Sequence, residues 1–295
     1  MKYISLIIAL LLPSTVMAQD SLQVFACEPE WGALVKELGG ERVSVFTATH
    51  ALQDPHHIQA RPSLIAKARR ADLLVCTGAE LEVGWLPLLQ RKASNARIQD
   101  GAEGFFMATD YVALSAIPQR LDRSEGDIHA AGNPHIHLNP HLIAEVAIPL
   151  SQRLQQLDTT NSDFYQQRYN AFKQKWTAAI KQWESKAIPL KGKKVVVYHN
   201  HWVYLNQWLG LEQVATIEAK PGIPPSSGDL SRLLTQMKNN PAELIIYAAY
   251  QSSRSAEWLA NKTGIPVTPL AATTDENQLF SFFDNLISTL LQEHK

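Results

Sequence analysis

The chain has little of several features that would point to other classes of protein. It holds two cysteines in 295 residues, and its charges nearly cancel, with a formal net charge of −1. A nucleic-acid-binding protein would show a basic stripe, so we expect no nucleic-acid partner. Beyond the first 18 residues, no segment has the length and apolarity of a membrane helix. We therefore expect the mature chain to be soluble.

The first residues have the pattern of a secretory signal peptide. Lys2 gives the positive start, residues 4–12 form an apolar stretch, and Val16-Met17-Ala18 is a small-residue cleavage pattern. These features predict an exported, periplasmic protein cleaved near Ala18. No cysteine directly follows that position, so we do not expect a lipid-anchored form.

The two cysteines each end an apolar run, LQVFAC and ADLLVC. An even pair in an oxidising compartment favours a disulfide between Cys27 and Cys76, provided that the two runs are neighbouring strands. The alternative is a pair of small buried thiols.

Strand-like apolar runs alternate with helix-like segments in both halves of the chain. This alternation predicts an α/β fold with parallel sheets and helices on their faces. The expected strands are 22–27, 42–48, 71–78, 193–199, 213–219, 242–249 and 265–271, and the expected helices 29–38, 63–71, 82–91, 202–209, 227–238, 253–262 and 278–293.

One longer helix is expected between the two halves, over about 162–187. Its large apolar side chains recur every three or four residues and so lie on one face, namely Tyr165, Tyr169, Phe172, Trp176, Ile180 and Trp183. The predicted organisation is a signal peptide (1–18), an N-terminal lobe (19–160), a connecting helix (161–189) and a C-terminal lobe (190–295). Ligands of open α/β sheets bind beyond the carboxyl ends of strands, which places a site in the cleft between the lobes.

Nine of the ten histidines gather in three short clusters within expected loops. Neutral imidazole is the commonest protein ligand of borderline-soft divalent metals. One histidine from each cluster would leave a fourth position for a carboxylate or water, as in a tetrahedral zinc site. The clusters are His50, His56 and His57; His129, His135, His137 and His141; and His199 and His201.

The residues alone leave several choices open. Either His56 or His57 can be the ligand of the first cluster, since adjacent residues do not easily face one ion. His201 opens a predicted helix and can serve as a cap or orient a ligand. For the fourth position, Asp275 and Glu276 are nearly equivalent, and both can instead cap the last helix.

Several motifs resemble one known family, the receptors of zinc and manganese ABC importers of the ZnuA/TroA type. They are Pro55-His56 followed by RPS, ADLLVCTGAELE, NPHIHLNP, YHNHWVY and IEAKPGIPPSSGDLSRL, and the likeness covers essentially the whole mature chain. The resemblance implies two α/β lobes joined by one rigid helix, with a metal ion in the cleft. It also implies His56, His135 and His199 as ligands, and Asp275 is the closest match to the carboxylate that many members supply.

The departures from the family pattern lie mostly near the second cluster. His137 stands where a tryptophan is usual, and Asn133 and Asn139 stand where aspartates are common. The family's long histidine-rich loop is reduced here to RSEGDIHAAG. We therefore expect weaker metal capture by this loop and no severe loss of affinity on substituting His129, in contrast to His56, His135 and His199.

The resemblance and the ligand types together predict a non-enzymatic carrier of Zn²⁺. Three imidazoles with at most one carboxylate favour zinc, whereas manganese prefers more oxygen ligands. The expected partner is the membrane permease of an ABC importer, with a periplasmic zinc chaperone as a second candidate, and the protein is expected to be a monomer. The alternatives are an exported zinc-dependent hydrolase, for which no general base stands out, and a manganese-binding or adhesin-type receptor of the same fold.

Overall fold

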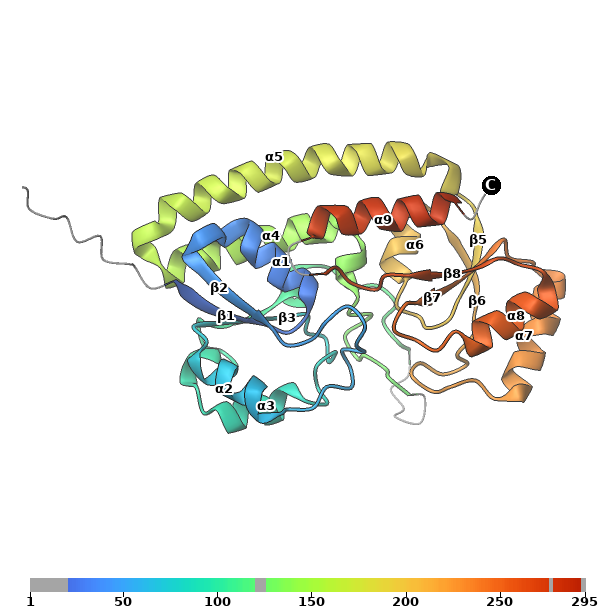
Figure 1. The fold of residues 1–295 in the computed structure, drawn as a ribbon, viewed down its shortest axis with the longest axis horizontal. Coiled ribbons are helices and arrows are strands. Elements are labelled where there is room, and N and C mark those ends of the chain that lie inside the picture. Colours follow the sequence, from blue (N-terminus) through green and yellow to red (C-terminus); the bar gives the residue numbers. More distant parts are fainter. Residues whose placement is uncertain (1–20, 120–125, 276–277, 293–295) are drawn as a thin grey trace, which may run out of the picture.

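Two α/β halves lie side by side beneath one long helix (Figure 1). The computed structural model describes residues 21–119, 126–275 and 278–292. Each half contains a four-stranded sheet in which all pairings are parallel. The predicted fold class is confirmed.

The first sheet has the strand order β2-β1-β3-β4. The strand β3 is buried along its whole length, as expected of a strand covered on both faces. The elements of this half are β1 (Leu22–Ala26), α1 (Pro29–Gly39), β2 (Val43–Thr47), α2 (Pro62–Arg70), β3 (Leu73–Cys76), α3 (Leu86–Ala93), β4 (Phe105–Met107) and α4 (Pro140–Leu157).

The second sheet repeats this plan with the strand order β6-β5-β7-β8. In both sheets the first strand of the half lies in the middle, so the loops after β1 and β5 open at the point where the strand order reverses. The elements are β5 (Lys194–Val197), α6 (Val203–Leu209), β6 (Glu212–Thr216), α7 (Ser227–Asn239), β7 (Leu244–Ala248), α8 (Arg254–Thr263), β8 (Val267–Leu270) and α9 (Leu279–Gln292).

The connecting helix α5 runs from Ser162 to Ala187 and spans both halves (Figure 1). Its 26 residues correspond to about 39 Å at 1.5 Å per residue. Its predicted apolar face is buried except for Tyr169, which is half-buried. Trp176 packs edge-on against Phe283 of α9, and near the C-terminal end of α5 Trp183 Nε1 donates to Asp284 Oδ1 of α9 at 3.1 Å. Near its other end, Arg168 donates hydrogen bonds to the Glu37 carbonyl oxygen of α1. The helix is thus fastened at both ends.

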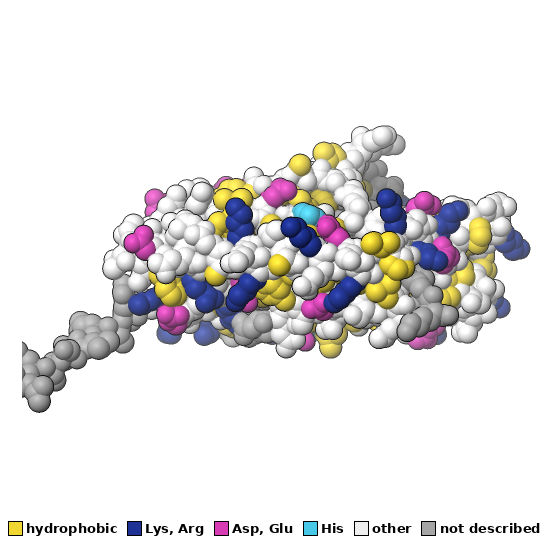
Figure 2. Space-filling view, turned by 90° about the horizontal axis from the view of Figure 1, so that it is seen from above, with side chains coloured by type: hydrophobic (Ala, Val, Ile, Leu, Met, Phe, Trp, Pro, Cys, Tyr) yellow, Lys and Arg dark blue, Asp and Glu magenta, His cyan; other side chains and the backbone are white. Residues whose placement is uncertain are grey.

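The predicted disulfide is present between Cys27 and Cys76. Cys27 directly follows β1, and Cys76 is the last residue of β3, the strand paired with β1. The Cα atoms of the two cysteines lie 4.8 Å apart. No helix in the described part of the chain is long and apolar enough to cross a membrane. Basic and acidic side chains are interspersed on the face seen from above α5 (Figure 2), in keeping with the small net charge.

Two predicted helices begin at other residues than expected, and two elements were not predicted. The helix expected at 82–91 begins only at Leu86, because turns with positive φ at Ala79 (48°) and Glu80 (67°) precede it. The helix expected from Ser63 begins at Pro62. The helix α4 and the three-residue strand β4 were not predicted.

Candidate metal centre

Three histidines from three distant loops meet in the cleft between the halves. His56 lies between β2 and α2, His135 precedes α4, and His199 follows β5. Each of the three offers one ring nitrogen, and these three nitrogens lie within 4.8 Å of one another. The ring centroids are 5.7–6.1 Å apart, and all three side chains are buried. This is a preformed triad of imidazoles.

The orientation of His56 is fixed by its neighbour Asp54. The Asp54 carboxylate accepts from the backbone amide of His56 at 3.0 Å and lies 2.8 Å from its Nδ1. Burial alone would raise the pKa of Asp54, but the contacts with His56 outweigh burial and lower it. Because an ionised carboxylate can only accept, Nδ1 carries the proton and Nε2 offers its lone pair to the cleft.

A second carboxylate orients His199 in the same way. Glu218 Oε2 lies 2.8 Å from His199 Nδ1 and also accepts from the Gly222 amide at 2.9 Å. Glu218 follows β6, next to β5 in the sheet, and is buried. The pairing holds the protonated nitrogen of His199 away from the cleft, which leaves Nε2 free to bind a metal.

His135 has no such partner, and its Nε2 is buried without a hydrogen bond. Its backbone is held instead, since the His135 amide donates to Asn133 Oδ1 at 3.0 Å. Asn133 also reaches the second half, because its Nδ2 donates to the Asn200 carbonyl oxygen at 2.6 Å. Burial lowers the pKa of His135 well below its usual value, and the neighbouring imidazoles lower it further. The ring is therefore neutral and has an open nitrogen.

A fourth imidazole, His129, faces the triad. Its Nε2 lies 3.2 Å from His56 Nε2, and its Nδ1 lies 3.0 Å from the Ala79 carbonyl oxygen. A carbonyl oxygen can only accept, so the proton of His129 sits on Nδ1. Burial lowers the pKa of His129 to about 4, so the ring is neutral at neutral pH. Two lone pairs thus face each other, and a cation between them would relieve their repulsion.

The distance between these two nitrogens matches a shared metal ion. Two ligands bound at about 2.0–2.1 Å in a tetrahedral zinc site are roughly 3.3 Å apart. The cleft beside His129, His135 and His199 contains a cavity of about 140 Å³, which has room for a hydrated ion. The sequence did not predict His129 as a ligand. What pointed to it was that the shortened loop keeps a metal-binding residue type there, near Asp127.

The other candidate residues that the structure describes lie outside the triad, and Glu276 lies outside the described residues. The side chain of His57 is exposed, and its Nε2 lies 3.8 Å from Asp127 Oδ2. His137 Nε2 bonds the Ala272 carbonyl oxygen at 2.8 Å. Asp275 is exposed, and it does not belong to the group of metal-capable side chains that the described residues form around His56. The structure thus brings together three of the four predicted ligands.

Two lobes around a buried cluster of imidazoles define a receptor for a metal cation. The sequence agrees with this class, because the model of the family "Zinc-uptake complex component A periplasmic" matches residues 24–293. The chain belongs to this family of substrate-binding components of metal ABC importers. Its members are solute receptors rather than enzymes, so the protein is a receptor that works with a membrane importer.

Individual relatives carry the names of different metals. The manganese ABC transporter lipoprotein PsaA of Streptococcus pneumoniae is 21% identical over 260 residues, covering 86% of this chain and 80% of its own. The high-affinity zinc uptake protein ZnuA of Bacillus subtilis is 24% identical over 215 residues, covering 72% of this chain and 66% of its own.

Solved structures share the fold. A crystal structure of ZnuA aligns with a TM-score of 0.78 at 22% identity, covering 94% of this chain and all of that one (100%). The Pseudomonas aeruginosa protein FpvC, in complex with Mn²⁺, aligns with a TM-score of 0.76 at 18% identity, covering 93% and 98%. The fold therefore occurs in proteins named for different metals, and the metal must be argued from this chain's own ligands.

Proposed function

We propose that this protein captures Zn²⁺ in the periplasm and delivers it to the permease of an ABC importer. The carrying observation is the cluster of His56, His135 and His199, with the Nε2 of His129 3.2 Å from that of His56. Four imidazoles are a borderline-soft donor set that suits zinc, whereas manganese prefers oxygen ligands. In this set His129 takes the position predicted for Asp275.

The remaining parts of the proposal follow from the sequence and the family. The segment before residue 19 directs export and is removed near Ala18. The N-terminal lobe, helix and C-terminal lobe keep the predicted boundaries at 160 and 189. The protein acts as a monomer that meets the permease, and a periplasmic zinc chaperone is a candidate donor of the ion.

Metal competition tests the choice of ion. Metal-free protein is titrated with Zn²⁺ and with Mn²⁺ by calorimetry, and Zn²⁺ is expected to bind more tightly. The variants His56→Ala, His135→Ala and His199→Ala should each lose most of this affinity, because one of the few metal ligands disappears. His141→Ala is the matched control, since that histidine is exposed and pairs with Glu184. Tighter binding of Mn²⁺ would support the manganese receptor instead.

A further inference from the structure

A tight turn just after β3 has an unusual backbone. Gly78, Ala79 and Glu80 follow one another with φ of 89°, 48° and 67°. The Leu81 amide closes the turn by donating to the Gly78 carbonyl oxygen at 3.1 Å. A left-handed backbone brings the Cβ of an ordinary residue too close to the following carbonyl oxygen, so Ala79 and Glu80 are strained. We call residues 78–81 the left-handed turn.

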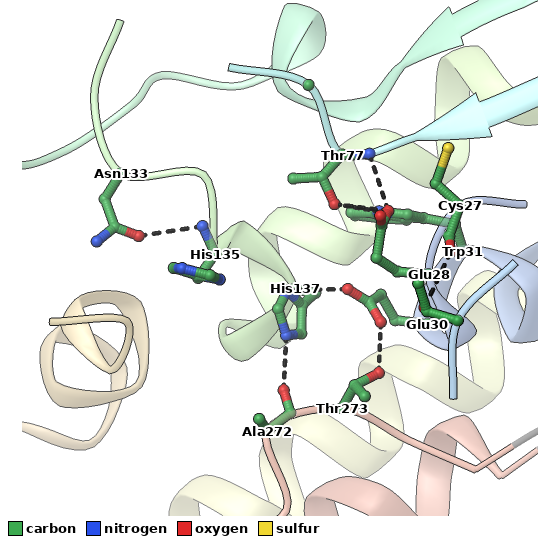
Figure 3. A network of polar contacts seen from close by, with 12 residues as sticks. Cys27, Glu28, Glu30, Trp31, Thr77, Asn133, His135, His137, Ala272 and Thr273 are labelled. Atoms are coloured by element: carbon green, nitrogen blue, oxygen red, sulfur yellow. Dashed lines mark hydrogen bonds and ion pairs between the residues drawn. The ribbon is translucent and has the colours of Figure 1, made fainter. Parts of the chain in front are cut away.

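Buried carboxyl groups hold the start of the left-handed turn. The Thr77 amide donates to Glu82 Oε1 at 2.8 Å and to Glu28 Oε2 at 3.2 Å. The Thr77 hydroxyl also donates to Glu28 Oε2, and Figure 3 shows both bonds between these two residues. The Gly78 amide donates to Glu82 Oε2 at 3.1 Å. Backbone strain persists only where the surroundings over-determine it, and these buried bonds do so.

The left-handed turn contacts the His129 segment at two consecutive residues. The Ala79 carbonyl oxygen lies 3.0 Å from His129 Nδ1, and Glu80 Oε2 accepts from the Ala130 amide at 3.0 Å. The first contact fixes which ring nitrogen carries the proton, and the second holds the backbone next to that ring. Glu80, His56 and His129 line the same cavity. The turn therefore reaches the metal cleft from the side of His129.

We propose that the left-handed turn, through Ala79 and Glu80, positions His129 as a zinc ligand. This inference rests on the proposed function, because it needs His129 in the metal site. Residues 126–135 form neither helix nor strand, so the turn supplies the support that regular structure gives elsewhere. Glu80 is a positioning residue that acts through the Ala130 amide. A ligand held in place before the ion binds loses less conformational freedom on binding, which raises affinity.

Two substitutions at Glu80 separate its hydrogen bond from its charge. Glu80→Ala removes both, whereas Glu80→Gln removes the charge but keeps an oxygen that can accept from Ala130. Chelator competition should show a loss of zinc affinity of about 10-fold for Glu80→Ala and of less than about threefold for Glu80→Gln. Glu80 is exposed, so neither change should disturb folding. Glu145→Ala, an exposed change in α4, is the matched control.

Two further measurements connect this loss to His129. In a His129→Ala background, Glu80→Ala should cost less than about threefold, because the ligand that it positions is already gone. Nitrogen-15 NMR of the histidine rings in metal-free protein gives a signature that needs no zinc. Wild type should carry the His129 proton on Nδ1 alone, and Glu80→Ala should show a mixture of the two tautomers.

The outcomes separate this proposal from the proposed function. Wild-type affinity of Glu80→Ala, equal losses in Glu80→Ala and Glu80→Gln, or an undiminished loss in the His129→Ala background would each overturn the positioning role. An unchanged His129 tautomer in Glu80→Ala would overturn it as well. If His129→Ala binds zinc as wild type does, this proposal fails while zinc capture by the triad stands. Absence of tight zinc binding by wild type would instead overturn the proposed function.

Discussion

The Nε2 atoms of His56 and His129 lie 3.2 Å apart, although 73 residues separate them in the chain. Each ring has its other nitrogen held by an acceptor, Asp54 for His56 and the Ala79 carbonyl for His129. Both free lone pairs therefore point at the same spot. The folded loops thus hold these two nitrogens in place without a metal, and in the proposed function the ion lies between them.

Replacing His129 by alanine should weaken zinc binding more than the loss of an orienting neighbour does, which typically costs about 10- to 100-fold. The reason is that His129 is a direct ligand in the proposed site. Competition with a zinc chelator of known affinity measures the change. His57→Ala is the control, because its exposed ring follows His56 in the same loop. If His129→Ala and wild type bind zinc equally well, His129 is not a ligand, and the fourth ligand is water or Asp275.

Glu218→Gln should reduce zinc affinity by about 10- to 100-fold without unfolding the protein. The amide keeps the shape of the carboxylate but no longer holds the proton on His199 Nδ1, 2.8 Å away, as firmly. Glu212→Gln, an exposed change in β6, should leave affinity unchanged. Competition with a zinc chelator measures the affinity of both variants. Identical affinities would mean that Glu218 only accepts the hydrogen bond of the Gly222 amide and does not orient His199.

Removing the disulfide should lower stability while sparing metal binding. The link joins residues 49 positions apart, for which loop-closure entropy gives about 4 kcal/mol. Urea unfolding of the metal-free Cys27→Ala/Cys76→Ala variant measures the loss of unfolding free energy. Zinc affinity of the folded variant should match wild type, because neither sulfur lies among the four imidazoles. A stability loss below about 1 kcal/mol would show that packing alone holds β1 and β3 together.

The buried Glu82 should make stability depend on pH. Burial raises its pKa to about 7 from 4.5 in the folded chain, so folding favours the protonated carboxyl. This contribution to the free energy of unfolding is complete below about pH 4.5 and is lost as pH rises through 7. Glu82→Gln cannot ionise, so its stability relative to wild type should rise between pH 5 and pH 8, by about 1.4 kcal/mol for each pH unit in the steepest part.

Thermal melts of the metal-free proteins check this difference, and Glu145→Gln, an exposed change in α4, is the control. Taking the difference between variant and wild type cancels the titration of the histidines, which act in the same way in both. A constant difference across this pH range would mean that Glu82 ionises near its ordinary pKa.

The fold was largely predictable from local patterns. Strands such as β3 are short apolar runs, and α5 shows its buried face in the spacing of Phe172, Trp176 and Trp183. The helix α4 was not predicted because it starts at Pro140, within the second histidine cluster, and contains Pro149 in its interior. The start of α3 escaped because Ala79 and Glu80 adopt positive φ, which neither residue type signals.

The site was predictable only in part. The rule that ligands bind beyond the carboxyl ends of strands placed the histidine clusters in the cleft, and the family resemblance selected His56, His135 and His199 from them. The contact of His129 with His56 depends on how a shortened loop folds back over Ala79, which no local pattern records. The orienting role of Glu218 depends in the same way on β6 lying beside β5.

The attachment of α5 to both halves limits how far the metal-bound and metal-free forms of this receptor can differ in shape. With Arg168 tied to α1 and Trp176 packed on α9, a wide clamshell swing would tear apart a continuous core. We therefore expect release and uptake to proceed through small tilts and the reshaping of surface loops at the mouth of the cleft. A transporter that tells full from empty has to read those loops rather than the distance between the two bodies.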